Sequence, residues 1–288
     1  MSEMLPPPAV RGGSPSGIAL ACRGVGFSYS EGRRAIPALR DVSFDLAAGG
    51  SLALLGASGS GKSTLLQVVR GLDEAESGAV LLDGRAQGEA GHAELRREVG
   101  LVFQAPELQL FASTAREDVA FGPRRLGWSD ADVAAAVDEA MELSGLPPAD
   151  FGERHPYTLS GGEQRRLALA GVLAMRPRLL LLDEPFVSLD PQTRRELVGI
   201  LRRLEDDGVT LVLATHDIDL AWALCDSLLL LDEGRVASAG AWDFGDAGAR
   251  LLAANRLREP LLVTLWRRLG RHPGQAPRTA AAAAELLS

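Results

Sequence analysis

One glycine-rich stretch decides the fold of this chain: it reads Gly56-Ala57-Ser58-Gly59-Ser60-Gly61-Lys62-Ser63, with Thr64 directly after it. The stretch follows an apolar run at 51–55 and precedes a segment of helical spacing at 64–70 that ends at Gly71. It fits the pattern G-x-x-x-x-G-K-[ST] in full, in the setting of strand, loop and helix that this pattern requires. We therefore predict a phosphate-binding loop and assign all of these residues to the binding of a nucleotide.

The chemistry of such a loop follows from its residue types. Glycines let successive backbone N–H groups turn inward around phosphates, and the helix behind them adds its positive N-terminal end. Lys62 is expected to reach the β- and γ-phosphates as a catalytic residue, and the Ser63 hydroxyl is expected to hold Mg²⁺. Lys62 is also the single lysine among the 30 basic residues. The alternative is a flexible Ser/Gly linker, and the complete motif, its context and the lone lysine together argue against it.

Further apolar runs predict the sheet around this loop; they lie at 99–103, 179–182, 209–214 and 228–231. Several are separated by amphipathic helices such as 191–204. Buried strands that alternate with helices indicate a largely parallel sheet covered on both faces. Near the N-terminus, 18–29 and 42–46 mix apolar and β-favouring residues around a turn at 30–32, which predicts short antiparallel strands.

These patterns define an α/β fold of the P-loop NTPase class with four parts. The mainly parallel sheet and an N-terminal antiparallel β subdomain occupy 18–242. A helical insertion is expected at about 105–175, where the strand signal vanishes and 130–143 is Ala-rich with helical spacing. Helical spacing returns at 248–256 and 260–269, which predicts a short helical C-terminal extension at 243–273. Flexible tails are expected at 1–17, rich in Pro, Gly and Ser, and at the low-complexity end, 274–288.

Composition excludes several classes of protein. With 46% hydrophobic and 24% charged residues among 288, the chain is neither disordered nor fibrous. No run approaches the ~18 to 20 apolar residues of a membrane span, and the N-terminus lacks the features of a signal peptide. The net charge of −8 argues against a nucleic-acid partner. The two cysteines, Cys22 and Cys225, lie far apart and indicate neither a disulfide framework nor a zinc site.

Two carboxylates follow the buried run at 179–182. In open α/β sheets such strand ends are where ligands bind. Asp183 fits the carboxylate on the Mg²⁺ side of a P-loop ATPase, and Glu184 is placed to polarise the attacking water as general base. The alternative, a turn with two solvated acids, is weakened by the presence of the phosphate loop.

A third segment, Leu159-Ser160-Gly161-Gly162-Glu163-Gln164, opens a helix. Ser160 is a good N-cap and the two glycines free backbone donors, so this helix end is expected to form a second anion site. A plain capped helix is the alternative reading of this segment alone.

Together the phosphate loop, the paired carboxylates and this LSGGEQ segment resemble the ATP-binding cassette (ABC) superfamily over roughly 18–240. The resemblance implies that the chain binds ATP and Mg²⁺ and hydrolyses the ATP. It also implies that two cassettes pack head to tail, so that Ser160, Gly161, Gly162 and Glu163 of one cover the γ-phosphate held by the other. The second cassette is either another copy or a paralogue.

The same resemblance implies roles for four further residues. Tyr29 matches the aromatic residue that stacks on adenine, although a core tyrosine is the alternative. Gln104 matches the glutamine that touches Mg²⁺ and the water and joins the helical insertion. Asp190 belongs to a loop, 188–190, that crosses to the partner, and His216 matches the histidine that contacts the γ-phosphate.

A narrower resemblance links the chain to the ATPases of energy-coupling-factor (ECF) importers, which take up vitamins or cobalt and nickel ions. It rests on four segments, 101–111, 117–123, 126–127 and 170–175, and on a C-terminal helical extension at 258–269. Ser58 and the segment 186–188 depart from that pattern without touching a catalytic side chain. The resemblance implies an energy-coupling subunit on the cytoplasmic face of the membrane. An ATPase of an ordinary binding-protein-dependent importer, or an ABC ATPase outside transport, is the alternative.

Membrane subunits are expected to dock on the insertion after Gln104, because that residue links the γ-phosphate to the insertion. The apolar contacts are assigned to Leu108, Leu110, Phe111 and Phe121. The alternative is that these residues form the small core of the insertion.

Overall fold

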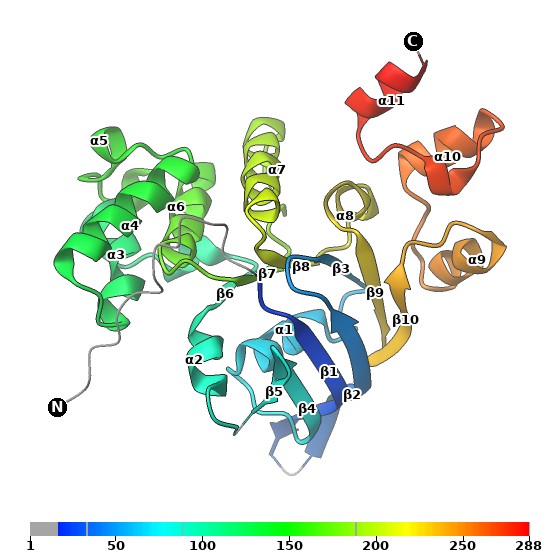
Figure 1. The fold of residues 1–288 in the computed structure, drawn as a ribbon, viewed down its shortest axis with the longest axis horizontal. Coiled ribbons are helices and arrows are strands. Elements are labelled where there is room, and N and C mark those ends of the chain that lie inside the picture. Colours follow the sequence, from blue (N-terminus) through cyan, green and yellow to red (C-terminus); the bar gives the residue numbers. More distant parts are fainter. Residues whose placement is uncertain (1–16, 33, 88, 188, 288) are drawn as a thin grey trace.

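The structure is a computed structural model that describes residues 17–287 apart from 33, 88 and 188 (Figure 1). Except for Gly17, the tail expected at 1–17 therefore lies outside the described residues, as does Ser188 of the loop at 188–190. No helix within the described ranges is long and apolar enough to cross a membrane.

A six-stranded sheet forms the centre of the fold. Its strands, in order across the sheet, are β10 (Arg235–Ala241), β9 (Ser227–Asp232), β3 (Ser51–Leu55), β8 (Thr210–Ala214), β7 (Leu179–Asp183) and β6 (Val99–Val102). All neighbours are parallel except β10, which pairs antiparallel with β9 at one edge. The strands β3, β6, β7 and β8 are buried along their whole length, which is why they read as continuous apolar runs. The predicted mainly parallel sheet is confirmed.

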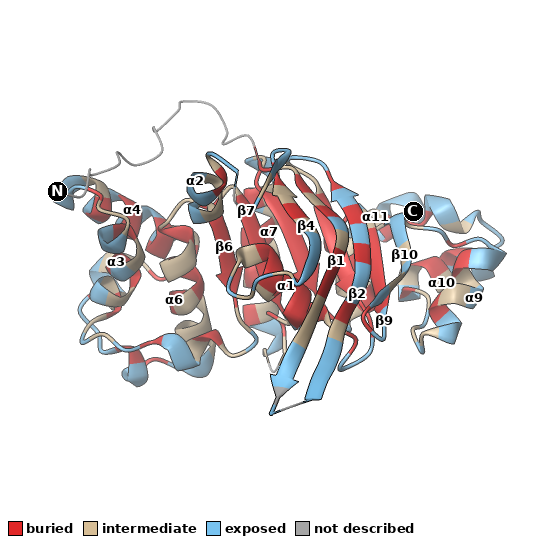
Figure 2. Ribbon diagram, turned by 90° about the horizontal axis from the view of Figure 1, so that it is seen from below, coloured by how far each residue is buried: buried red, intermediate tan, exposed pale blue. Residues whose placement is uncertain are grey.

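Side chains that alternate along these strands enter two hydrophobic clusters, one on each face. Along β7, Leu180 and Leu182 enter a cluster shared with the insertion, α7 (Pro191–Asp206) and α8 (Ile218–Leu224). Leu179 and Leu181 enter the other cluster, together with α1 (Lys62–Arg70) and the antiparallel sheet. The central sheet is thus packed on both faces, and Figure 2 shows buried residues along the centre of both sheets.

The antiparallel sheet contains β2 (Arg34–Leu46), β1 (Leu20–Glu31), β4 (Ser77–Leu82) and β5 (Arg85–Ala86), in that order. The second strand is longer than the expected 42–46. Its first four residues are all exposed, and Ala35, Ile36 and Pro37 follow one another without alternating with polar residues, so no strand period reveals this part. Pairing with β1 extends the strand to Arg34 and forms a long hairpin.

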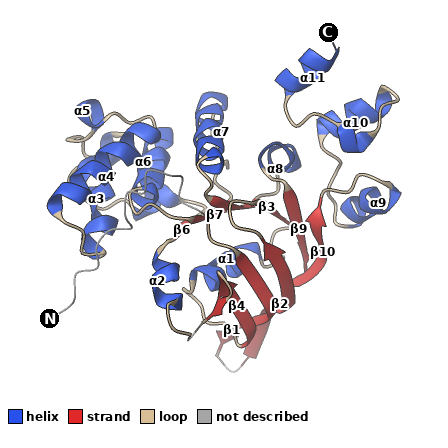
Figure 3. Cartoon of the chain, viewed as in Figure 1, coloured by secondary structure: helices blue, strands red, loops and turns tan. Residues whose placement is uncertain are grey.

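Helices occupy the range of the expected insertion, as Figure 3 shows. They are the 3₁₀ helix η1 (Pro106–Gln109), α3 (Ala115–Arg125), α4 (Asp130–Leu143), α5 (Pro148–Phe151), η2 (Pro156–Thr158) and α6 (Gly161–Leu173). Another short helix, α2 (His92–Arg97), precedes β6. Polar residues begin the longer helices: the side chains of Thr114 and Ser129 accept backbone N–H groups in the first turns of α3 and α4.

The C-terminal part corrects one expectation. It contains α9 (Asp246–Ala254), α10 (Leu261–Arg268), η3 (Pro273–Gln275) and α11 (Ala280–Leu287), so the described part of the expected tail, 274–287, is not a flexible tail. The indole N–H of Trp222 donates to the Pro277 carbonyl over 3.3 Å, and the guanidinium of Arg278 lies 4.8 Å from the Trp222 ring centre. Ala283 is buried in the larger hydrophobic cluster. These contacts join distant parts of the chain and leave no local signal in an Ala-rich sequence.

Candidate functional site

The glycines of the phosphate loop are required by its backbone. Gly56 has φ +150°, and a Cβ there would lie 2.4 Å from the carbonyl oxygen of Leu231. Gly61 has φ +103°, and a Cβ there would lie 2.7 Å from the carbonyl oxygen of Ala38. Side chains at these two positions would push the loop away from the sheet that supports it.

Lys62 lies inside this loop. Its Nζ donates to the carbonyl oxygens of Gly56 and Ala57, at 2.9 and 3.2 Å. Burial lowers the pKa of Lys62 below its ordinary value, and the nearby carboxylates of Glu184 and Asp183 oppose that effect. The helix α1 starts at Lys62 without a side-chain cap, so its first N–H groups are directed to a ligand. A phosphate would receive both these donors and the ammonium group.

Asp183 ends β7 beside Ser63. Burial raises the pKa of Asp183 above its ordinary value, and the nearby Ser63 hydroxyl opposes that effect. The described residues hold no cluster of three His, Cys, Asp or Glu side chains suited to a metal. Mg²⁺ needs no such cluster, because it takes one or two protein oxygens and completes its shell with water and phosphate oxygens. The pair of Ser63 and Asp183 therefore fits Mg²⁺.

Glu184 has an unusual backbone. It adopts φ +48°, and its N–H donates to the carbonyl of Ala214 at the end of β8. This conformation aims the side chain at His216, whose Nδ1 lies 2.9 Å from one carboxylate oxygen and 3.0 Å from the other. The Glu184 side chain is 12% exposed and that of His216 is 69% exposed. A carboxylate held by an imidazole at a strand end is suited to accept a proton from water.

Tyr29 lies over the helix that follows the phosphate loop. Its hydroxyl shares a hydrogen bond of 3.0 Å with Thr64 and donates to Gln67 over 3.2 Å. The side chain is 43% exposed, and the ring of Phe27 meets it edge to face. The alternative of a core tyrosine is therefore wrong.

The LSGGEQ segment begins α6 with a capping box. The Ser160 hydroxyl accepts the N–H of Glu163, and the Glu163 carboxylate accepts the N–H and the hydroxyl of Ser160, each at 2.7 Å. These two bonds lower the pKa of Glu163. Its carboxylate thus orients the helix start, while the exposed Gly161 leaves room in front of it.

Asp190 precedes α7, and Gln104 precedes the insertion. Asp190 caps α7, because one carboxylate oxygen accepts the N–H of Gln192 and of Thr193, at 2.9 and 3.1 Å. Bonds to Thr193 lower the pKa of Asp190. Gln104 is exposed and follows β6, which ends one residue earlier than expected from the apolar run at 99–103.

The structure brings most of the predicted site together and leaves one part outside. Lys62, Ser63, Asp183, Glu184 and His216 meet where β3, β7 and β8 end. The start of α6 lies instead among the helices of the insertion, away from α1, in both Figure 1 and Figure 2. One chain therefore presents a nucleotide site and, separately, the LSGGEQ helix end.

Three charged contacts around the site had not been predicted. Arg165 donates to Glu107 over 3.1 Å, Arg166 donates to Glu196, and Arg194 donates to Asp217. No spacing rule links residues 20 to 60 positions apart, so these pairs need the structure. Only Asp217 carried a local signal, as a helix-capping residue type directly before the apolar start of α8.

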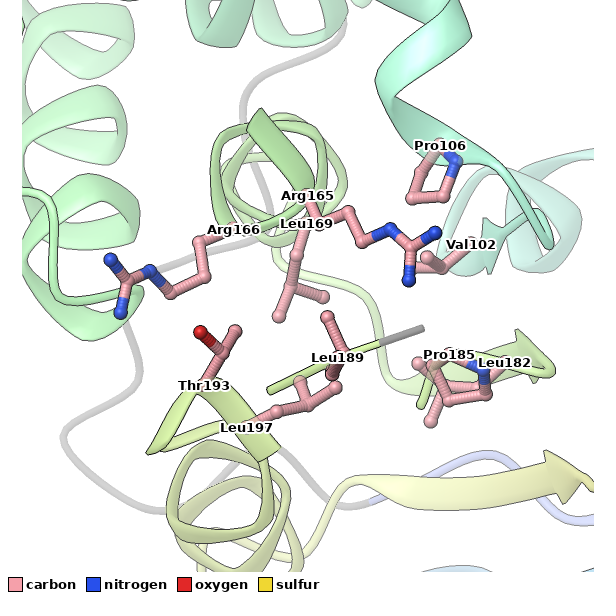
Figure 4. Close-up of a pocket in the computed structure, with 10 residues that line it drawn as sticks. All are labelled: Val102, Pro106, Arg165, Arg166, Leu169, Leu182, Pro185, Leu189, Thr193 and Leu197. Atoms are coloured by element: carbon pink, nitrogen blue, oxygen red, sulfur yellow. The ribbon is translucent and has the colours of Figure 1, made fainter. Parts of the chain in front are cut away.

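The first two arginines line a cavity between α6 and α7. It is bounded by Val102, Pro106, Arg165, Arg166, Leu169, Leu182, Pro185, Leu189, Thr193 and Leu197. Figure 4 shows Arg165 and Arg166 leaving α6 toward opposite sides of it. The cavity marks the junction between the insertion and the α/β body.

The expected docking residues separate into two kinds. Leu108, Phe111 and Phe121 are 81%, 61% and 43% exposed, and the two phenylalanine rings meet edge to face with centres 4.9 Å apart. Leu110 is 3% exposed and belongs to the larger hydrophobic cluster. Its assignment as a docking contact is wrong, because its side chain is already covered by the core of the insertion.

The chain is similar in sequence to ATP-binding proteins of transporters. Residues 39–187 match a family model described as ABC transporter. The chain is 43% identical over 263 residues to the cobalt import ATP-binding protein CbiO of Rhodobacter capsulatus, covering 91% of this chain and 92% of that protein. It is 40% identical over 249 residues to the energy-coupling factor transporter ATP-binding protein EcfA of Carboxydothermus hydrogenoformans, covering 86% and 90%.

Solved structures show the same fold. CbiO1 from Clostridium perfringens, part of the ABC transporter complex cbiONQ, superposes with a TM-score of 0.70 at 30% identity and covers 89% of this chain and 100% of its own. The ATP-binding cassette MJ0796, in a dimeric post-hydrolysis state bound to ADP and Pi, gives 0.69 at 30% identity and covers 77% and 98%.

Proposed function

This chain belongs to the ABC transporter family of ATPases, and from that premise we propose that it powers an ECF-type importer of a vitamin, cobalt or nickel. The arrangement of Glu184 carries the proposal: its carboxylate is held by His216 at the end of β7, next to the phosphate loop. Two observations support the ECF type: the likeness to CbiO and EcfA, and the C-terminal helices after β10.

Each residue of the site has a proposed task in hydrolysis. Lys62 leaves the loop carbonyls and binds the β- and γ-phosphates, while the N–H groups of 56–64 surround them. Ser63, Asp183 and Gln104 would hold Mg²⁺, which would supply positive charge to neutralise the phosphate oxygens. Glu184 takes a proton from the attacking water.

Two more side chains complete the binding of ATP. His216 contacts the γ-phosphate and keeps Glu184 oriented through Nδ1. Tyr29 stacks on the adenine, with its hydroxyl fixed by Thr64 and Gln67.

The remaining part of the site comes from a second cassette, another copy or a paralogue. The LSGGEQ helix end lies away from the phosphate loop of its own chain, and a head-to-tail partner would bring one onto each γ-phosphate. ATP would then bind the closed pair more tightly than the open one, so binding drives closure and hydrolysis releases it.

The chain would bind to the cytoplasmic face of the membrane, where membrane subunits would contact the insertion. Closure and opening of the cassette pair would then move these subunits. The exposed surface of Leu108, Phe111 and Phe121 supports the docking site, because such grouped apolar residues mark interaction sites. Gln104 lies next in the chain to η1, so a change at the nucleotide reaches this surface by a short path.

Affinity purification of the tagged chain from detergent-solubilised membranes of its host tests the proposal. We expect integral membrane subunits to copurify, and with them ATP hydrolysis that needs Mg²⁺. A soluble substrate-binding protein required for activity would favour an ordinary importer. Purification without any membrane protein would contradict a transport role.

A further inference from the structure

The first two turns of α7 lie between two parts of the site that serve different nucleotides. Figure 1 shows α7 standing between the helices of the insertion and α8. Asp190 fixes the start of α7, since its second carboxylate oxygen accepts the Thr193 hydroxyl at 2.6 Å. Side chains on the following turn contact α6 on one side and the turn before α8 on the other.

Toward the insertion, α7 is bound to α6, here called the signature helix because it begins with LSGGEQ. The Arg166 guanidinium donates to the Glu196 carboxylate, and the Gln192 amide donates to the same group over 2.8 Å. The Arg166 and Glu196 side chains are 16% and 36% exposed. A Cβ on Gly162 would lie 2.9 Å from Oγ1 of Thr193, so the two helix starts touch. Movement of one helix start must carry the other along or break these contacts.

Toward the other side, Arg194 binds α7 to the turn that bears His216. Its guanidinium donates to one carboxylate oxygen of Asp217, whose other oxygen caps α8. His216, the preceding residue, holds the Glu184 carboxylate. The side chains of Arg194 and Asp217 are 38% and 29% exposed, so solvent screens the pair only in part.

We propose that Arg194 and Glu196 are positioning residues that couple the two nucleotide sites of an assembled pair of cassettes. The inference rests on the head-to-tail arrangement of the proposed function. There, Glu184 and His216 act on the nucleotide of their own chain, whereas the signature helix acts on the partner's. The helix α7 is bonded to both through these two residues, so closure of one site shifts the other.

The test is the dependence of ATP hydrolysis on ATP concentration, measured on the chain purified with the subunits that accompany it. Coupling of two sites typically changes affinity roughly 5- to 150-fold and gives a Hill coefficient of up to about 2. We expect the Glu196→Gln and Arg194→Gln variants to approach a Hill coefficient of about 1, as for independent sites.

Two further variants separate coupling from simple loss of charge or structure. Arg203→Gln removes a charge from the same helix and should keep the unaltered Hill coefficient. Its exposed guanidinium has one bonding partner among the described residues, the Gly199 carbonyl of α7. The exchanged pair Arg166→Glu with Glu196→Arg restores an ion pair and should recover cooperativity that Glu196→Arg alone loses. Melting temperatures confirm that each variant is folded.

Each other outcome counts against the inference. Variants that turn over more slowly but stay cooperative would show a merely structural or catalytic role. Non-cooperative hydrolysis by the unaltered chain would overturn the coupling and leave the proposed function standing. Absence of ATP hydrolysis by the unaltered chain would contradict the proposed function itself, and the inference with it.

Discussion

Glu184 adopts a backbone conformation that is unfavourable for its residue type but suits its proposed function. Its φ of +48° lies in the left-handed region, which costs a non-glycine residue about 1 to 3 kcal/mol. The pairing of β7 with β8 holds it there, since the Glu184 N–H continues the ladder to Ala214. Such strain is tolerated where it aims a reactive group, and here it aims the carboxylate at His216.

Replacement of that carboxylate by an amide tests its role. Glu184→Gln keeps the size of the side chain but removes the proton acceptor, and loss of a general base costs ~10² to 10⁴ in rate, or about 3 to 5.5 kcal/mol of barrier. We expect phosphate release to fall by that factor while ATP still binds. Glu94→Gln, at an exposed position of α2, is the matched control and should turn over normally. Turnover of Glu184→Gln at the control's rate would remove Glu184 from the mechanism.

At the scale of single elements, sequence predicts what local chemistry decides. Ser160 was predicted as a helix cap, and β3 and α4 have the bounds that the pattern predicted, because the order of apolar and polar residues along the chain indicates burial and helical spacing. Tertiary contacts decide the rest. The segment that leads into α11 is held by contacts of Pro277 and Arg278 with Trp222, a residue far away in the sequence, and no periodicity of an alanine-rich segment reveals such a partner.

Leu110 and Phe111 also show that sequence does not predict which side chains are buried by tertiary packing. They are adjacent apolar residues after η1, where no helix or strand period distinguishes inside from outside, yet they are 3% and 61% exposed. Only the packing of the insertion, which encloses Leu110, separates a core residue from a candidate docking contact.

This pair also supplies an experiment on the docking surface. Phe111→Ala should leave the melting temperature nearly unchanged and weaken copurification of membrane subunits, because the exposed ring contributes to docking more than to the core. Leu110→Ala is the matched control: loss of a buried leucine typically costs about 2 to 5 kcal/mol of folding free energy, so it should melt lower. If Phe111→Ala melts normally and retains its membrane partners at full strength, Phe111 is not a docking contact.

At the scale of the whole molecule, the two parts that we propose to form one ATP site lie in separate places of the chain. The phosphate loop, Asp183, Glu184 and His216 gather at the ends of the central strands, while the signature helix begins in the insertion. Sequence predicted both halves by their motifs, but the distance between them in one chain is a property of the fold. A second cassette is the simplest way to bring the halves together.

ATP-dependent association of the Glu184→Gln variant tests this central claim most directly. Light scattering would measure the mass of this variant in two samples, one with ATP and Mg²⁺ and one with ADP. A third sample would contain ATP and the double variant Glu184→Gln/Lys62→Ala, which lacks the phosphate-binding ammonium. Any paralogous ATPase that copurifies would be added to each sample. Because slow hydrolysis leaves ATP in place, we expect the mass to double in the first sample. In the other two samples we expect the mass of a single cassette. A variant that binds ATP at saturation and still has the mass of one cassette would contradict the composite ATP site.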